Sequence, residues 1–169
     1  MNVSRLLRWA ILPRKYLSNL LRLTNYQFMS QKVLFLDFDG VLHPTYSGSP
    51  KFTQLPILES VLTKQPCKIV ISSSWRFHMS NEKLRSHLSL PLQSMIIGTT
   101  GNAQITPHAR FEEIKAFVDS HQIVDWKALD DSYWEFPSVC INLIRCNPNT
   151  GITQVEALQL RTWLTNTSS

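Results

Sequence analysis

Short apolar runs alternate with stretches of helical periodicity from residue 33 onward, and the two patterns predict two kinds of element. Continuous apolar runs bounded by polar or turn residues are typical of strands that are buried on both faces of a sheet. The sequence predicts five such strands, at 33–36, 68–71, 94–97 (closed by Gly98), within 123–129 and at 139–144. Each interval between the first four leaves room for a helix.

Helix-start signals stand in these intervals. Proline in a first turn, or a serine or threonine just before it, marks where a helix begins. One helix is predicted from Pro56 to Lys64, and another after Ser80 as its cap. A third should start at Thr106-Pro107, with threonine as the cap. The last should be opened by the capping box Thr153-Gln154-Val155-Glu156.

The order of these elements predicts the α/β class. A Rossmann-like, mostly parallel five-stranded sheet with helices on both faces is expected. In such a fold functional side chains gather at the carboxyl ends of the strands. Asp37, Ser72 and Asp130 each follow an apolar run. We therefore expect the strand before Asp37 to be central, with the Ser72 strand on one side and the Asp130 strand on the other.

The first 30 residues differ from the rest in charge. They carry five basic residues, and no acidic residue precedes Asp37, whereas the other 12 basic residues equal the 12 acidic ones. A general polyanion-binding surface on the domain at 31–169 is therefore not indicated. Three interpretations of the basic extension 1–30 stay open: a dispensable segment ahead of a start at Met29, an organellar targeting segment, or a structural or membrane-surface helix.

Localisation follows from two further patterns. No apolar run approaches the roughly 18–20 residues that a transmembrane helix needs. The three cysteines match no zinc spacing, and Cys67 and Cys140 lie in or beside apolar runs. This usage is typical of buried thiols in a reducing compartment. We expect a cytoplasmic protein, or a mitochondrial one if residues 1–28 are a transit peptide.

Two pairs of acidic residues follow predicted strands. Asp37 and Asp39 are two positions apart, which points both to one side, and Gly40 allows the chain to turn away sharply. Asp130 and Asp131 end another strand. Four carboxylates at one sheet edge repel each other, so a divalent cation is expected, and oxygen ligands favour magnesium over zinc. A carboxylate can also attack phosphorus and form an aspartyl-phosphate.

These residues resemble the motifs of the haloacid dehalogenase (HAD) superfamily. Asp37-Phe38-Asp39-Gly40-Val41-Leu42 is similar to the first motif, Ser72-Ser73-Ser74 to the second and Asp130-Asp131 to the acidic fourth. The resemblance covers roughly residues 33–164. It extends to the small HAD domains of Swiss Army knife RNA-repair proteins through three further segments, His43-Pro44, Ser74-Trp75-Arg76 and Gly151-Ile152-Thr153.

The resemblance implies a role for each matching residue. Asp37 is the nucleophile and a metal ligand. Asp39 is the general acid and base, with its backbone carbonyl on the metal. Ser72 binds the phosphoryl oxygen, or Ser73 does if the strand ends one residue later. Asp130-Asp131 holds Mg²⁺ directly or through water.

The third motif is where this sequence departs from the common pattern, in which a lysine offsets the negative charge. The matching helix start offers Arg110, whose fork suits phosphate, and a solvent-facing helix arginine is the alternative. Lys127 is the second candidate, although we expect it to point into or along its strand. Arg76 lies just past the second motif and is a candidate for binding a phosphate or another substrate anion.

The intervals from Gly40 to Lys68 and from Gly98 to Arg110 are too short to hold a cap domain. A capless HAD site implies an open site and a bulky phosphorylated substrate, such as a nucleic-acid end or a phosphoprotein, and a small phosphate ester also fits. Trp75, Trp126 and Trp134 are candidates for stacking a base, with core packing expected for at least two of them.

The expected function is that of a Mg²⁺-dependent phosphatase of phosphate monoesters that works through an aspartyl-phosphate. Two rivals stay open. One is a non-catalytic binding module that keeps the fold and the metal. The other is an RNA-end-processing component that needs a protein partner, since the chain has no glycine-rich Walker loop of its own.

Overall fold

The computed structural model describes residues 31–166, so the interpretations of the extension 1–30 lie outside the described residues. Five strands form one sheet in the order β3-β2-β1-β4-β5, and every neighbouring pair is parallel. The predicted class and the central position of the Asp37 strand are therefore confirmed. The strands are β1 (Val33–Leu36), β2 (Lys68–Ile71), β3 (Ile96–Thr99), β4 (Trp126–Asp130) and β5 (Leu143–Arg145).

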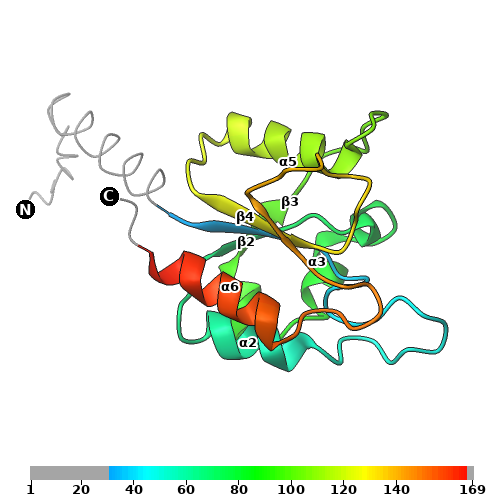
Figure 1. Ribbon diagram of the computed structural model, residues 1–169, viewed down its shortest axis with the longest axis vertical. Helices are drawn as coiled ribbons and strands as arrows, with labels where there is room; N and C mark the ends of the chain where they lie inside the picture. The colour runs from blue at the N-terminus through cyan, green and yellow to red at the C-terminus, as the bar shows by residue number, and fades with distance from the viewer. Residues whose placement is uncertain (1–30, 167–169) are drawn as a thin grey trace, which may run out of the picture.

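Helices cover both faces of this sheet (Figure 1). They are α2 (Leu55–Leu62), α3 (Asn81–Arg85), α4 (Leu90–Met95), α5 (Ala109–Ser120) and α6 (Gln154–Thr165), with a 3₁₀ helix, η1 (Ser74–Phe77), after β2. None of these helices is long and apolar enough to cross a membrane.

Strand β1 shows why its sequence is apolar throughout. Successive side chains of a strand point to opposite faces, so Leu34 and Leu36 join the core under α2 and α6, whereas Val33 and Phe35 join the core under α5. All four are buried. A strand buried on both faces has no position for a polar residue until it ends, and the first polar residue after β1 is Asp37.

At two predicted helix starts the local sequence signals can be compared with the structure. Thr153 and Glu156 form the expected capping box at α6: Val155 N–H donates to the threonine hydroxyl, and Thr153 N–H donates to the Glu156 carboxylate at 2.8 Å. By contrast, the prediction of a helix starting at Thr106-Pro107 was wrong. Helix α5 starts at Ala109, and its N-cap His108 makes no side-chain capping bond.

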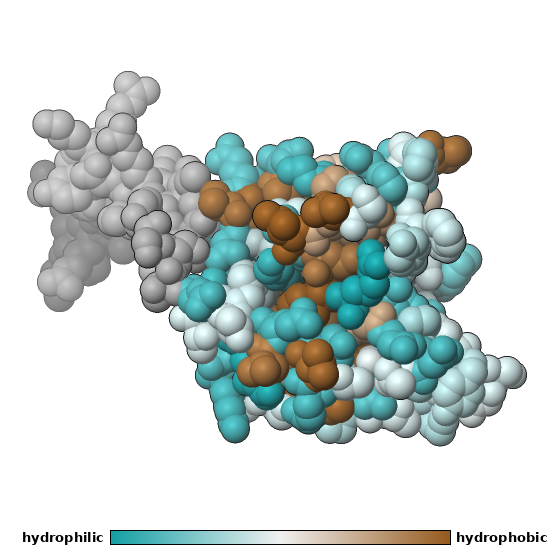
Figure 2. Space-filling view, in the orientation of Figure 1, coloured by the Kyte–Doolittle hydropathy of each residue, from teal (hydrophilic) through white to brown (hydrophobic). Residues whose placement is uncertain are grey.

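Two strand boundaries were also misplaced. The third strand starts at Ile96 and contains Gly98, because Ser94 and Met95 complete α4, which the sequence pattern did not indicate. The fifth strand begins at Leu143. Val139 and Ile141, which the apolar pattern assigned to it, are exposed in the segment between β4 and β5 that crosses in front of the sheet (Figure 1). Apolar residues show on this part of the surface (Figure 2).

The connections leave the carboxyl edge of the sheet uncapped. Between β1 and β2 the chain forms a loop and α2, and between β3 and α5 it forms a connector at 100–108. The described residues therefore contain no cap domain.

Candidate active site

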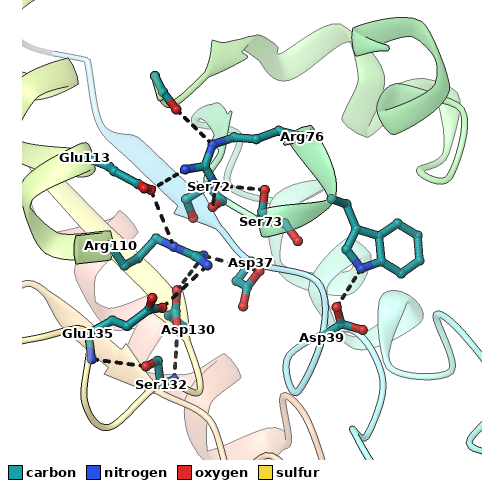
Figure 3. A network of polar contacts seen from close by, with 12 residues as sticks. Asp37, Asp39, Ser72, Ser73, Arg76, Arg110, Glu113, Asp130, Ser132 and Glu135 are labelled. Carbon is teal, nitrogen blue, oxygen red and sulfur yellow. Dashed lines mark hydrogen bonds and ion pairs between the residues drawn. The ribbon is translucent and has the colours of Figure 1, made fainter. Parts of the chain in front are cut away.

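The carboxyl ends of the three central strands bring the predicted residues together (Figure 3). Leu36 is in register with Ile71 on one side and with Leu129 on the other. The backbone N–H of Asp37 continues the ladder to the carbonyl of Leu129 at 3.1 Å, and that of Ser72 donates to Leu36 at 2.9 Å. The sheet thus fixes the backbone of both residues before any side-chain contact is made.

Three carboxylates form a cluster at this edge. Asp37, Asp130 and Asp131 each offer an oxygen within 4.8 Å of the others. The fourth predicted acid, Asp39, turns its carboxylate away toward Trp75 (Figure 3). Only the backbone carbonyl of Asp39 is left for the metal-binding role that the resemblance implies, and this role stays a prediction.

The charge of this cluster is only partly compensated. Burial, followed by the nearby Asp37, raises the pKa of Asp130 well above its usual value. The same two causes raise the pKa of Asp131 to about 6. A divalent cation between carboxylates of this kind stabilises their ionised form. The all-oxygen donor set suits Mg²⁺, so these residues fit the ion that the sequence predicts.

Asp131→Asn is expected to stabilise the metal-free protein at pH 7. A raised carboxyl pKa means that the folded state binds the proton more tightly than the unfolded chain. The destabilisation by the Asp131 charge is therefore absent below about pH 4, grows between about pH 4 and 6, and is complete above about 6. Because Asp131 is only partly buried, we expect on the order of 1 kcal/mol, or about 2–4 °C in Tm. Thermal melts in excess chelator measure it.

The same melts with magnesium chloride provide the test of binding. Wild-type protein should gain stability because the ion binds the folded state, and most of this gain should disappear in Asp131→Asn. Asp119→Asn, at an exposed position on α5, is the control and should keep the gain. A wild-type Tm that does not respond to Mg²⁺ would argue against the metal site.

Gly40 is required at its position for two reasons. Its φ of +67° lies in the left-handed region that side chains rarely adopt. A Cβ there would also overlap the carboxylate of Asp131. The glycine of the first motif therefore makes room for an acid of the fourth.

Arg110 is the cation of this site. It lies in the first turn of α5, and its guanidinium is 3.2 Å from Asp130 and 3.4 Å from Asp37. Burial alone would lower the pKa of Arg110, but the carboxylates of Asp37 and Asp130 outweigh it and raise the pKa. The alternative, Lys127, donates to the backbone carbonyl of Ile141 instead. Of the two candidates, the fold places Arg110 against the acids.

The side chain of Arg76 is also buried, but its donors are engaged elsewhere. The guanidinium donates to the backbone carbonyls of Ser72 and Ser73, to Gly101 at 3.2 Å and to the carboxylate of Glu113 (Figure 3). These contacts hold the backbone of the serine run. They differ from the phosphate contact for which Arg76 was a candidate.

Glu113 was missed at the sequence level. It pairs with Arg76 and also lies 3.8 Å from Arg110, one turn earlier on α5. A buried glutamate between two arginines fixes both of them. The available signal was its i,i+3 spacing from Arg110, which places both on one side of the helix.

Glu113→Ala is expected to lower the free energy of unfolding by about 3 kcal/mol, because removing one member of a buried ion pair leaves the others uncompensated. Glu112→Ala is the matched control: Glu112 is the preceding residue on the same helix and is exposed. Chemical denaturation measures both variants. Equal stability of the two would show that the arginines do not depend on Glu113.

Ser72 and Ser73 are completely buried, and neither hydroxyl has a hydrogen-bond partner in the described structure. The Thr100 hydroxyl, just after β3, is in the same situation. A buried hydroxyl without a partner costs about 1–3 kcal/mol, which is tolerated mostly where a ligand completes the bond. Both serines remain candidates for binding the phosphoryl oxygen.

Asp39 is held by three side chains that stand outside the acidic cluster. The indole N–H of Trp75 donates to one oxygen at 2.6 Å, and His43 and Lys51 contact the other at 2.9 and 3.3 Å. Burial alone would raise the pKa of Asp39, but these hydrogen bonds outweigh it and lower the pKa. The sequence analysis named Trp75 as a candidate for base stacking and His43 as part of a segment that resembles the family, and it did not single out Lys51.

The parallel sheet, the acids at its central strand ends and the arginine facing them define a HAD-type domain. The chain belongs to the family described as the HAD domain in Swiss Army Knife RNA repair proteins, whose model matches residues 33–157. No curated protein and no solved structure matches the chain.

Proposed function

We propose that this domain is a Mg²⁺-dependent phosphohydrolase that cleaves phosphate monoesters through an aspartyl-phosphate on Asp37. One observation carries the proposal. The Asp37 carboxylate stands at the end of the central strand, within 4.8 Å of the oxygens of Asp130 and Asp131 and 3.4 Å from Arg110. A nucleophile, a cation site and a fixed positive charge thus converge on the place where a phosphoryl group would sit.

In the first step an oxygen of Asp37 bonds to phosphorus as the bond between phosphorus and the leaving oxygen breaks. The leaving oxygen takes a proton from Asp39. Arg110 and the hydroxyl of Ser72 or Ser73 stabilise charge on the equatorial oxygens. Bound magnesium, held by Asp37 and Asp130-Asp131, would supply further charge neutralisation.

In the second step a water gives its proton to Asp39 and attacks the phosphorus of the acyl-phosphate, which releases phosphate and restores Asp37. The lowered pKa of Asp39 suits this base role. As the acid of the first step Asp39 must carry a proton, which requires it to leave the hydrogen bonds that lower its pKa. In the described structure it faces Trp75 (Figure 3), so proton transfer requires it to rotate toward Asp37.

The proposal is tested by a phosphate-release screen with nucleotides, sugar phosphates, phosphopeptides and RNA ends. Wild-type protein should release phosphate from at least one class, and only with Mg²⁺. Activity that persists in excess chelator, or no release from any class, would count against it.

A second candidate is an RNA-end-processing module that works with a partner. The family description and the uncapped edge favour it. A wholly non-catalytic role is less well supported, because the acids and Arg110 are all in place. Phosphate release by the isolated chain would separate the enzyme from a partner-dependent module.

A further inference from the structure

The exposed aromatic side chains are unevenly distributed. Among residues 31–166 the exposed phenylalanine, tyrosine and tryptophan side chains are Tyr46, Phe77, Tyr133 and Trp134, and the other large exposed hydrophobic side chains are aliphatic. All four lie in the segments that follow the carboxyl ends of β1, β2 and β4, which are the strands that carry the acids and serines of the site. The edge of the sheet that holds the site is therefore also the edge that carries the exposed rings.

Two of these rings form a pair beside the acidic cluster. Tyr133 and Trp134 are 61% and 78% exposed, and their rings meet edge to face with centroids 5.1 Å apart. They follow Asp131 by two and three residues, so the Cα of Trp134 lies within about 11 Å of that of Asp131. This separation is short enough for one ligand to reach both the rings and the acids.

The loop that presents the rings is fixed at several points. Ser132 N–H donates to Asp130 at 2.9 Å, and Glu135 N–H donates to the Ser132 hydroxyl at 3.2 Å. The Glu135 carbonyl accepts from Phe111 N–H at 3.0 Å, and its carboxylate lies 3.7 Å from Arg110. A loop held in this way loses little further freedom when it binds a ligand.

A cation stands next to the pair. Arg145 ends β5, where it is in register with Asp130, and its guanidinium lies 4.7 Å from the centre of the Tyr133 ring. It has no carboxylate partner within residues 31–166, and its Nε has no hydrogen-bond partner there. Exposed rings beside an arginine that has no ion pair among the described residues match a ligand that alternates flat bases with phosphates.

We infer that Tyr133, Trp134 and Arg145 form a subsite for the terminal bases of a single-stranded polynucleotide whose end phosphate occupies the Asp37 site. The inference rests on the proposed function and names its substrate class. Bases stack on Trp134 and Tyr133, and Arg145 contacts a backbone phosphate next to the terminal one. Stacking is tolerant of base identity, so the subsite recognises a strand end rather than a sequence.

Two other substrates fit these features less well. A small phosphate ester does not reach rings that stand outside the acidic cluster. A phosphopeptide offers no regular series of flat groups and anions to match the rings and Arg145. Of the three tryptophans considered for base stacking, Trp126 is buried and Trp75 is hydrogen-bonded to Asp39, which leaves Trp134.

Binding is measured with Asp37→Asn protein and Mg²⁺, by fluorescence anisotropy of short RNA and DNA strands phosphorylated at the 3′ or 5′ end and labelled at the other. Trp134→Ala should weaken binding roughly 10- to 100-fold, and Trp134→Phe should restore most of it. Strands with abasic sites next to the phosphate should bind protein that keeps Trp134 as weakly as normal strands bind the Trp134→Ala variant. Leu90→Ala, at an equally exposed site at the start of α4, should have no effect.

Any of three results would overturn the subsite. Normal and abasic strands bind equally, Trp134→Ala has no effect, or a phosphopeptide shows the same Trp134-dependent binding. Kinetics with Asp37 intact add a second measure. Trp134→Ala should lower kcat/KM for a phosphorylated strand and leave that for para-nitrophenyl phosphate unchanged; equal losses on both would also overturn it. If strands bind through Trp134 but no substrate loses phosphate, the subsite stands and the proposed phosphatase fails.

Discussion

Asp37→Asn should lower turnover by roughly 10⁵- to 10⁶-fold, the scale on which removing an enzyme nucleophile acts. The amide has almost the shape of the carboxylate but cannot form the bond to phosphorus. The variant should stay folded, because the backbone N–H of Asp37 remains in the ladder to Leu129. It also relieves part of the repulsion that raises the pKa values of Asp130 and Asp131.

Steady-state phosphate release measures this effect, with circular dichroism to verify folding. Asp119→Asn carries the same chemical change at an exposed position on α5 and should be as active as wild type. An Asp37→Asn protein that keeps more than a small fraction of activity would show that the nucleophile lies elsewhere.

Asp39→Asn should lower turnover by roughly 10²- to 10⁴-fold, the usual range for losing a general acid or base. Its effect should depend on the substrate. A good leaving group needs little protonation, so Asp37 still attacks at a substantial rate, whereas hydrolysis of the acyl-phosphate is slow because no base activates water. The amide can still accept the hydrogen bond from Trp75, which keeps the loop in place.

Rapid-quench kinetics separate these two steps. With para-nitrophenyl phosphate, Asp39→Asn should release close to one equivalent of nitrophenol in a burst and then turn over slowly. With a poor leaving group, such as a ribose phosphate, it should show no burst. Uniform slowing without a burst on either substrate would mean that Asp39 acts only in formation of the acyl-phosphate, or that it only maintains the structure of the site.

The fold could be predicted from the sequence because its signals are local and agree with one another. The four apolar residues of β1 are buried on both faces, and the acids that end β1 and β4 must share one edge of a parallel sheet. The capping box at Thr153 is equally self-contained, since its partners lie within one turn. The boundaries of β3, β5 and α5 were less predictable, because exposed apolar residues and a threonine-proline pair are not unique to one element.

The candidate site was predictable only as far as the backbone determines it. The sheet places Asp37, Ser72 and Asp130, but the direction of long side chains depends on tertiary partners. Arg76 turns to carbonyls and Glu113, and Asp39 turns to Trp75. Lys51 reaches Asp39 from 12 positions further along the chain through a loop with no periodic pattern, so no local signal could have indicated it.

The most direct measurement is the location of the phosphoryl group during turnover. Asp39→Asn protein is mixed with para-nitrophenyl phosphate and Mg²⁺ and quenched in acid, and its peptides are mapped by mass spectrometry. One phosphoryl group on the peptide that contains Asp37, assigned to Asp37 itself by fragmentation and absent when Asp37 is also changed to asparagine, is the result we predict. Phosphate on another residue, or nitrophenol release with no phosphorylated peptide, would contradict an aspartyl-phosphate mechanism at this site.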